Sequence, residues 1–313
     1  MLRWRLLLGA IFVSVLIGLF ILDGRFPGYF LFPLALLLAV LAAQEMLRLT
    51  TVEMAAGIVD ADAEPSSRSL TTRPNHWVVY AGSLLVVGAN GGPLLWSGYP
   101  ADCPVGKLGW PMAALGVAVL LAFVGEFLRY QRPHGATINI GLTMLSIVYV
   151  GLISFLVQLR GLPDFEWGAV ALVSLLITVK MCDVGAYAIG RLIGRHKMAP
   201  KLSPAKTWEG FCGGIAFACL GAWFSFAVLA PRMVSAAPPL DSSALAGVLM
   251  YGVLIGVAGV LGDLAESLLK RSAGVKDSSA WMPGFGGVLD LLDSVLFAAP
   301  VAYICWVLGF VGP

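Results

Sequence analysis

Long apolar runs, each close to 20 residues and separated by polar segments, constrain this chain more than any other feature of its sequence. A run of about 20 apolar residues crosses the hydrocarbon core of a bilayer as an α-helix, whose backbone polar groups bond within the segment. Nine such runs lie near residues 6–22, 28–47, 77–97, 110–128, 138–158, 167–190, 208–230, 245–269 and 289–311. We therefore predict an all-α polytopic membrane protein with about nine transmembrane helices.

The composition supports this class, because 59% of the 313 residues are hydrophobic and only 12% are charged. Soluble domains carry about 25% charged residues. The first run follows a basic start but lacks a small-residue cleavage site, so we expect a retained helix rather than a signal peptide. The run at 77–97 is interrupted between Asn90 and Pro93, and it is the weakest of the nine as a predicted span.

The loops on the two predicted sides of the membrane differ strongly in their content of basic residues. Only Arg25, Lys107, Arg160 and Arg232 fall on one side, and Lys180 lies within a span. The other 15 of the 20 Lys and Arg residues fall on the opposite side. Because loops rich in Lys and Arg stay in the cytoplasm, we predict a cytoplasmic N-terminus and, after nine spans, an external C-terminus.

Polar residues concentrate in two segments, of which the first covers residues 180–214. Asp183 is expected to be buried within a span, where a charge usually marks a functional site. Tyr187 and Arg191 follow it on the same helical face. An ion pair between Lys180 and Asp183, three residues apart, is the structural alternative.

A basic loop lies within this first segment and leads into the span that begins near residue 208. It contains Lys201 and Ser203, and Lys206 and Thr207 stand at the predicted helix N-terminus. Backbone amides at a helix N-terminus and lysine side chains both bind phosphate groups. The alternative is that the lysines only mark the cytoplasmic side and attract anionic lipid. The many Gly, Pro, Ser and Thr residues favour a shaped site, although the P-loop pattern is absent.

The second polar segment, residues 262–294, combines acidic and basic side chains. They are Asp263, Glu266, Ser267, Lys270, Arg271, Lys276, Asp277, Asp290 and Asp293. The first four are spaced to form one stripe on a predicted helix, and the last two share a face of the final span. The helix dipole explains one aspartate at a helix N-terminus.

Three carboxylates around one loop need a further explanation, because Asp263, Asp290 and Asp293 would repel one another and resist burial. A hard divalent cation removes this conflict, and Mg²⁺ typically joins carboxylates to substrate phosphates. Carboxylates, a metal ion and basic side chains at a membrane surface together indicate phosphoryl or nucleotidyl transfer on a lipid.

Both polar segments resemble those of the CDP-diacylglycerol synthases, also called phosphatidate cytidylyltransferases. The family signature reads S-x-x-K-R-x₄-K-D, then P-x-H-G-G, then D-R-x-D. Matching positions are Ser267, Lys270, Arg271, Lys276, Asp277, Pro283, Gly286, Gly287, Asp290 and Asp293. Upstream elements at 183–191 and 201–210 are also similar. Residues 1–165 agree only in being hydrophobic, so we expect an N-terminal scaffold there and a catalytic region at 166–313, within one membrane domain.

The resemblance implies transfer of a cytidylyl group from CTP to phosphatidate, giving CDP-diacylglycerol and pyrophosphate for phospholipid biosynthesis. It implies Mg²⁺ as the cofactor, with Asp263, Asp290 and Asp293 as ligands, and Lys270 and Lys276 as further catalytic residues. The implied substrate-binding residues are Asp183, Arg191, Lys201, Ser203, Lys206, Thr207, Ser267, Arg271 and Asp277.

The resemblance also implies partners and a location. The partners are CTP, phosphatidate and membrane lipid, with no nucleic acid. The location is the bacterial inner (cytoplasmic) membrane, with the active site facing the cytoplasm. A second cation and a homodimer are left open.

Two positions depart from the signature, since Phe285 replaces its histidine and Leu291 replaces its arginine. A family member with an altered substrate or without activity is therefore one alternative. A membrane transporter is another, although its polar residues would extend through several spans to both faces. A CDP-alcohol phosphatidyltransferase also uses paired aspartates, but its sequence pattern is absent.

Overall fold

The computed structural model describes residues 18–20, 22–24, 26, 28–51, 73–96, 98–100, 102–130, 135–162, 164–235, 237–238, 240–279 and 286–312. Helices dominate the described chain. They are α2 (Leu31–Thr51), α3 (His76–Gly88), α4 (Gly91–Leu95), α5 (Gly106–Arg129), α6 (Ala136–Gly151), α7 (Ile153–Arg160), α8 (Phe165–Ile193), α9 (Trp208–Phe224), the π-helical turn η3 (Ser225–Leu229), α10 (Ala230–Met233), α11 (Ser242–Ser272) and α12 (Val288–Val307). Two short strands, β1 (Lys197–Ala199) and β2 (Ser203–Thr207), pair in antiparallel fashion.

Eight helical segments of the described chain are long and apolar enough to cross a membrane. Three of them are composite, made of α3 with α4, α6 with α7, and α9 through α10. The eight coincide with the predicted spans from 28–47 onwards, which confirms the prediction of an all-α polytopic membrane protein. The predicted span at 6–22 lies mostly outside the described residues. The total of nine and the sides of the two termini therefore stay predictions.

Ala89 and Asn90 separate α3 from α4, so the helix is interrupted where the sequence from Asn90 to Pro93 predicts. The Asn90 side chain donates hydrogen bonds to the carbonyl oxygens of Val86 (3.2 Å) and Val87 (2.9 Å). Its own amide oxygen accepts a hydrogen bond from Gln158 Nε2 at 2.6 Å. These bonds satisfy carbonyl groups that the end of a helix leaves unpaired, which is required inside a bilayer.

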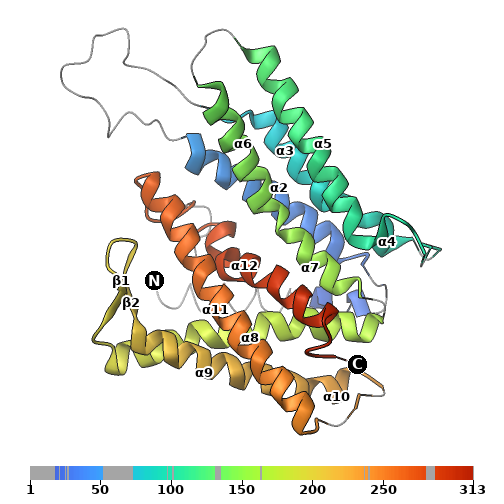
Figure 1. Ribbon diagram of the computed structural model, residues 1–313, viewed down its shortest axis with the longest axis vertical. Helices are drawn as coiled ribbons and strands as arrows, with labels where there is room; N and C mark the ends of the chain where they lie inside the picture. Colours follow the sequence, from blue (N-terminus) through green and yellow to red (C-terminus); the bar gives the residue numbers. More distant parts are fainter. Residues whose placement is uncertain are drawn as a thin grey trace.

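Two apolar cores meet at α12. One core is built by residues of α7 to α11, and the other by residues of α2, α3, α6 and α7. Val295 and Ala298 of α12 are buried in the first core, and Leu289 and Leu292 in the second. Within a bilayer the lipid is as apolar as these side chains, so close van der Waals packing against both cores holds α12 in place. Figure 1 shows α12 between the two groups of helices.

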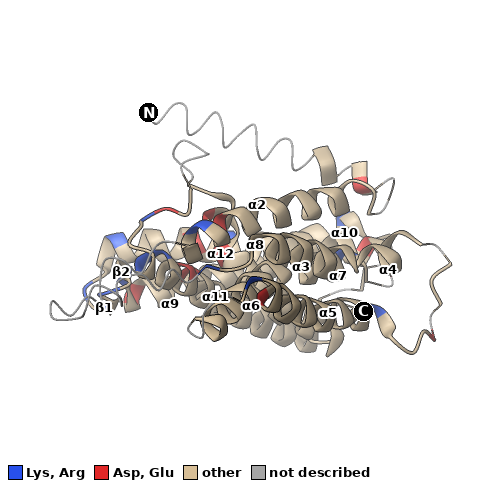
Figure 2. Ribbon diagram, turned by 90° about the horizontal axis from the view of Figure 1, so that it is seen from above, with Lys and Arg blue, Asp and Glu red and all other residues tan. Residues whose placement is uncertain are grey.

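Charged residues gather around β1, β2 and the start of α12, with a smaller group near α4 and α10 at the opposite end (Figure 2). We call the first of these regions the hairpin end. The C-terminal ends of α8 and α11 and the N-terminal ends of α9 and α12 all point toward it (Figure 1). The two polar segments singled out from the sequence are therefore brought together at one end of the helical bundle.

Candidate active site

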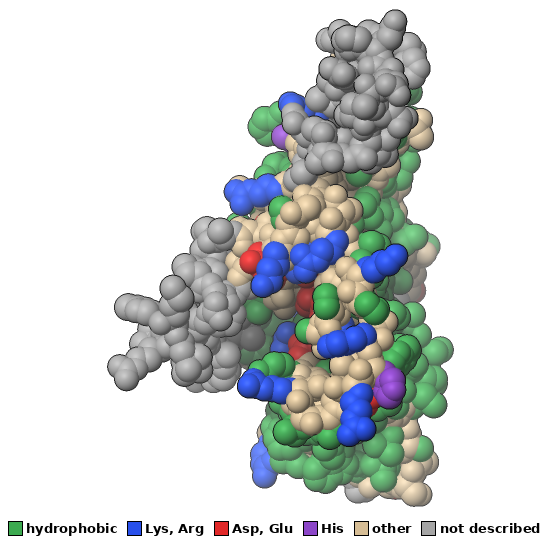
Figure 3. Space-filling view, turned by 90° about the vertical axis from the view of Figure 1, so that its left-hand side faces the viewer, with side chains coloured by type: hydrophobic (Ala, Val, Ile, Leu, Met, Phe, Trp, Pro, Cys, Tyr) green, Lys and Arg blue, Asp and Glu red, His purple; other side chains and the backbone are tan. Residues whose placement is uncertain are grey.

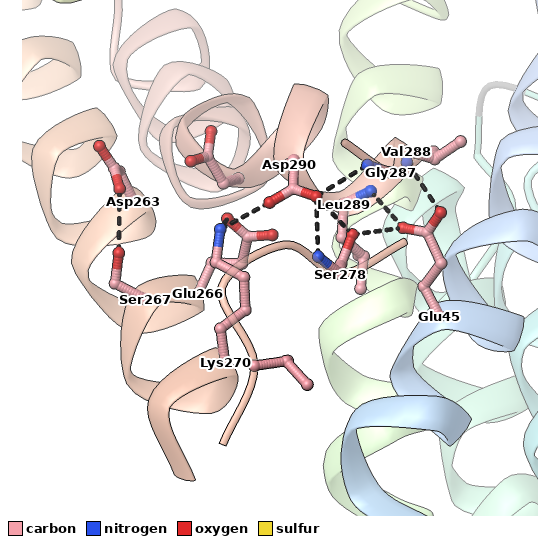
Figure 4. A network of polar contacts seen from close by, with 12 residues as sticks. Glu45, Asp263, Glu266, Ser267, Lys270, Ser278, Gly287, Val288, Leu289 and Asp290 are labelled. Carbon is pink, nitrogen blue, oxygen red and sulfur yellow. Dashed lines mark hydrogen bonds and ion pairs between the residues drawn. The ribbon is translucent and has the colours of Figure 1, made fainter. Parts of the chain in front are cut away.

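Asp290 lies in the first turn of α12, and hydrogen-bond donors surround its carboxylate (Figure 4). Oδ2 accepts hydrogen bonds from the amides of Gly287 (2.7 Å) and Ser278 (2.9 Å) and from the Ser278 hydroxyl (2.7 Å). The bond from Gly287 is the backward reach of a first-turn acid to the residue that caps its helix. Oδ1 forms an ion pair with Lys270 Nζ at 2.6 Å. Four contacts thus fix this predicted site residue.

Lys270 of α11 bridges two acids, because its Nζ also lies 2.9 Å from Glu266 Oε2. The Glu266 side chain is 0% exposed, whereas those of Lys270 and Asp290 are 12% and 11% exposed. Within the described residues, Glu266 Oε1 has no hydrogen-bond partner. A buried charge costs several kcal/mol unless it is paired, so both acids depend on this lysine. The sequence placed Glu266 on the polar stripe but assigned it no role.

Asp263, one turn before Ser267 on α11, connects this helix to the hairpin. Its Oδ2 forms an ion pair with Lys206 Nζ of β2 at 2.9 Å, and its Oδ1 accepts a hydrogen bond from the Ser267 hydroxyl at 3.3 Å. The two charged side chains are 20% (Lys206) and 36% (Asp263) exposed. A residue predicted to bind phosphate and a residue predicted to bind metal therefore neutralise each other here.

Asp293 lies one turn after Asp290, where α11 and α12 come into close contact. Gly262 permits this contact, since a Cβ there would clash with the Asp293 carbonyl oxygen. The Asp293 carboxylate is near enough to Asp263 and Asp183 for their negative charges to act on it, and the positive charge of Lys180 acts on it in the opposite sense. None of the ion pairs found between described residues includes Asp293. Asp263 and Asp293 thus form an acidic pair with Lys206 as its paired cation.

The structure divides the predicted Mg²⁺ ligands into two groups. Asp290 is engaged by Lys270 and backbone amides, while Asp263 and Asp293 lie near each other. In the part of the chain that is described, no three Asp, Glu, His or Cys side chains are grouped as a metal site. Mg²⁺ commonly takes one or two carboxylates and completes its shell with water and substrate phosphates. The pair therefore has suitable donor chemistry, and Mg²⁺ binding stays a prediction.

The hairpin of β1 and β2 presents the predicted phosphate-binding residues. Lys201 is exposed in its turn, and Ser203 is half-buried at the start of β2. Glu209, in the first turn of α9, accepts hydrogen bonds from the amides of Arg195 (3.1 Å) and His196 (3.2 Å) and also contacts the His196 ring. The loop is therefore anchored at its base by an acid that the sequence did not single out.

Three predicted substrate-binding residues make internal contacts. Thr207 is buried and caps α9, accepting a hydrogen bond from a first-turn amide at 3.1 Å. Arg191 donates a hydrogen bond to the Tyr187 hydroxyl at 2.7 Å. The expected burial of Asp183 is wrong: its side chain is 43% exposed, because described residues leave that face of α8 uncovered, and it pairs with Lys180 at 3.0 Å.

Exposed basic side chains surround the acids at the hairpin end. Figure 3 shows Lys and Arg side chains on this face, with Asp and Glu atoms visible between and beneath them. The exposed residues include Arg191, Arg195, Lys197, Lys201, Arg271 and Lys276, and also the acid Asp277. Arg271 donates hydrogen bonds to the carbonyl oxygens of Leu202 (3.4 Å) and Val275 (3.1 Å), so it ties the hairpin to the end of α11.

Glu45 of α2 is a further residue near the site that sequence reasoning missed. It is buried, and its carboxylate accepts hydrogen bonds from Ser278, Val288 and Leu289 (Figure 4). A signal was present in the sequence, since an acid within a predicted span is unusual and tends to be functional. Phe285, the first of the two departures from the family signature, lies outside the described residues, whereas Leu291 is half-buried on α12.

Comparison with known proteins identifies similar sequences over most of the chain. Residues 78–308 match the model of a family described as the cytidylyltransferase family. A Pseudomonas aeruginosa protein named phosphatidate cytidylyltransferase is 29% identical over 315 residues, which cover both chains completely. A Brucella suis protein of the same name is 31% identical over 236 residues, covering 73% of this chain and 70% of that protein. One from Bacillus subtilis is 36% identical over 166 residues, or 53% of this chain and 57% of that protein.

Proposed function

Because the chain belongs to the cytidylyltransferase family, we propose that it transfers a cytidylyl group from CTP to phosphatidate, giving CDP-diacylglycerol and pyrophosphate. The observation that carries this proposal is the acidic pair Asp263–Asp293 beneath exposed Lys and Arg side chains, at one end of membrane-spanning helices. Such a site meets CTP from water and phosphatidate from the bilayer. The names of the similar bacterial proteins support the same reaction.

The reaction is a displacement at phosphorus. A phosphatidate oxygen forms a bond to the α-phosphorus of CTP, and the bond from that phosphorus to the bridging oxygen of the β-phosphate breaks. Pyrophosphate leaves with the bonding electron pair. A phosphate monoester has its second pKa near about 6, so the attacking oxygen is already largely deprotonated near neutral pH. A strong general base is unnecessary, and phenylalanine in place of the family histidine is compatible with activity.

The residues of this chain act mainly by positioning and by neutralising charge. Lys201, Lys206, Arg271 and Lys276 hold phosphate groups of CTP and phosphatidate. Asp263 and Asp293 would hold Mg²⁺, with Asp290, one turn before Asp293 on α12, as the third proposed ligand. When bound, Mg²⁺ neutralises charge that develops on the transferred and leaving phosphates. Lys270 holds Asp290 and Glu266 in place rather than meeting substrate, because both of its contacts are acids of the protein.

The reaction itself is tested with purified protein, CTP labelled in the cytidine and phosphatidate in mixed micelles. We expect label to enter the organic phase only when phosphatidate and Mg²⁺ are both present. CDP-diacylglycerol is then identified by mass spectrometry. Label that stays in the aqueous phase with CTP, dCTP and every phosphatidate tried would contradict the proposed function.

We propose that the hairpin end faces the cytoplasm at the inner membrane. In a variant without the five native cysteines, Lys201→Cys and Ser243→Cys place single thiols at the two ends of the bundle. We expect an impermeant maleimide to label them from opposite sides of sealed inverted vesicles, with Lys201→Cys accessible from the face that was cytoplasmic. Labelling of both thiols from the same side would disprove the alternating topology.

Leu291→Arg restores the basic residue that the family signature carries between its two aspartates. We expect a change in rate of less than about tenfold, because Asp290 is already paired with Lys270 and the wild-type site has its acids and cations in place. Steady-state rates of label transfer at saturating CTP measure this effect, with Leu291→Met as the control for the change in side-chain shape. If the wild type is inactive and Leu291→Arg creates activity, the wild-type chain is not a synthase.

A further inference from the structure

Glu45 is a buried acid on a mainly apolar helix of the N-terminal half. It lies on α2, is only 5% exposed, and stands beside the fully buried Ala43 and Met46. Removing a carboxylate from water is costly unless strong hydrogen bonds replace the lost hydration. The hydrogen bonds that Glu45 accepts therefore indicate the role of this buried side chain.

The described hydrogen-bond donors to Glu45 are Ser278 and the first two residues of α12. Oε1 accepts a hydrogen bond from the Val288 amide at 2.9 Å, and Oε2 accepts one from the Leu289 amide at 2.8 Å and one from the Ser278 hydroxyl at 2.9 Å. Val288 and Leu289 open α12, so their amides have no partner within the helix. Glu45 thus caps α12 from a different helix, 243 residues away in sequence for Val288.

Gly287 makes this approach possible. A Cβ at Gly287 would clash with both the Ser278 hydroxyl and the Glu45 carboxylate. The glycine therefore lets the acid of α2 reach the first amides of α12.

The same Ser278 hydroxyl also lies 2.7 Å from Asp290 Oδ2 (Figure 4). Glu45 and Asp290 therefore both bind Ser278, and both accept hydrogen bonds at the first turn of α12, Glu45 from the amides of Val288 and Leu289 and Asp290 from that of Gly287. This turn carries Asp290 and determines where Asp293 stands one turn later.

We propose that Glu45 is a positioning residue of the active site, which sets the start of α12 and thereby the placement of Asp290 and Asp293 relative to Asp263. The inference rests on the proposed function, since these acids are the proposed Mg²⁺ ligands. It gives the N-terminal half a part in catalysis, and it concerns a residue that lies before the 78–308 region matched by the family model. Residues that orient metal ligands without touching the metal typically change metal affinity or activity by about 10- to 100-fold when replaced.

Glu45→Gln tests this role, because glutamine keeps the size of the side chain but presents one donor where a backbone amide or a hydroxyl now finds an acceptor. We expect turnover to fall by about 10- to 100-fold and half-saturation by Mg²⁺ to require a higher concentration. Glu45→Asp, which keeps the carboxylate on a shorter side chain, should recover part of the loss. Electron paramagnetic resonance measures the binding of Mn²⁺ to the protein in the presence of CTP and does not depend on turnover. We expect the Mn²⁺ affinity of Glu45→Gln to fall along with its activity.

Asp23→Asn provides the matched control. Asp23 is another buried acid, paired with Arg160 at 2.7 Å, but it accepts hydrogen bonds from the amides of Phe30 and Leu31 at the start of α2, whereas Glu45 lies near the other end of that helix. We expect Asp23→Asn to lower the thermal midpoint. The protein that remains folded should keep the wild-type Mg²⁺ dependence of turnover and the wild-type affinity for Mn²⁺. A Glu45→Gln protein that loses thermal stability but keeps wild-type Mn²⁺ affinity and turnover would overturn the proposal. A wild type without transfer activity would refute the proposed function, and the Mn²⁺ comparison would still decide the role of Glu45.

Discussion

Asp263→Asn and Asp293→Asn should each lower the rate of CDP-diacylglycerol formation by roughly 100-fold or more, the scale of losing one group that stabilises transition-state charge. The expectation follows from their placement, since these two acids lie where α11 and α12 are in contact and, among the described residues, Lys206 forms an ion pair with Asp263 and none is found for Asp293. An asparagine keeps the shape and removes the charge that holds Mg²⁺. Transfer of label into the organic phase, at equal amounts of folded protein, measures the effect.

Asp241→Asn is the control for these two changes. Asp241 caps the other end of α11, where it accepts a hydrogen bond from the Ala244 amide at 2.8 Å, and asparagine caps helices equally well. It should leave the rate unchanged. Higher Mg²⁺ should restore part of the activity of Asp263→Asn and Asp293→Asn if weakened metal binding is the main defect. Near-normal turnover in both variants would mean that neither acid holds the metal.

Lys270→Met should destabilise the folded protein by about 3 kcal/mol, because removing one partner of a buried ion pair leaves an uncompensated charge. In this variant both Glu266 and Asp290 lose their cation. Glu266 is 0% exposed, whereas Asp290 retains its hydrogen bonds from the backbone. The thermal midpoint in detergent, followed by circular dichroism, measures the loss. Adding Glu266→Gln to Lys270→Met should recover part of it, since the double variant buries one charge fewer.

Lys180→Met is the comparison for the Lys270 variant. Its ion pair with Asp183 has the same kind of geometry, at 3.0 Å, but the side chains are 50% and 43% exposed. Removing Lys180 leaves Asp183 on an uncovered face of α8 rather than enclosed by protein as Glu266 is, so the thermal midpoint should fall less than in Lys270→Met. Equal losses in Lys180→Met and Lys270→Met would show that burial is not what makes Lys270 important.

The helices could be predicted from the sequence because their signal is local. An apolar run of sufficient length has few alternatives in a bilayer, and the interruption of the run at 77–97 is explained by Asn90 to Pro93. The capping role of Thr207 was also within reach, since the residue stands just before the apolar span that becomes α9.

Contacts between distant residues could not be predicted in the same way. Nothing in the local sequence connects Glu45 with Leu289, or Lys206 with Asp263, because each pair depends on how whole helices pack. The predicted burial of Asp183 failed for the same reason: a position within a span gives depth in the membrane, whereas burial depends on which neighbour covers that face. Individual site residues were therefore easier to name than their partners.

The ion pair between Lys206 and Asp263 has a consequence for which ligands the site admits. A phosphate group that binds Lys206 without a metal ion leaves Asp263 without its cation, so little binding free energy is gained. A nucleotide with a bound divalent ion supplies a phosphate for Lys206 and a cation for Asp263. Both side chains then exchange one oppositely charged partner for another. We therefore expect free inorganic phosphate and the headgroups of surrounding lipids to compete poorly, because each would replace the partner of Lys206 but not that of Asp263.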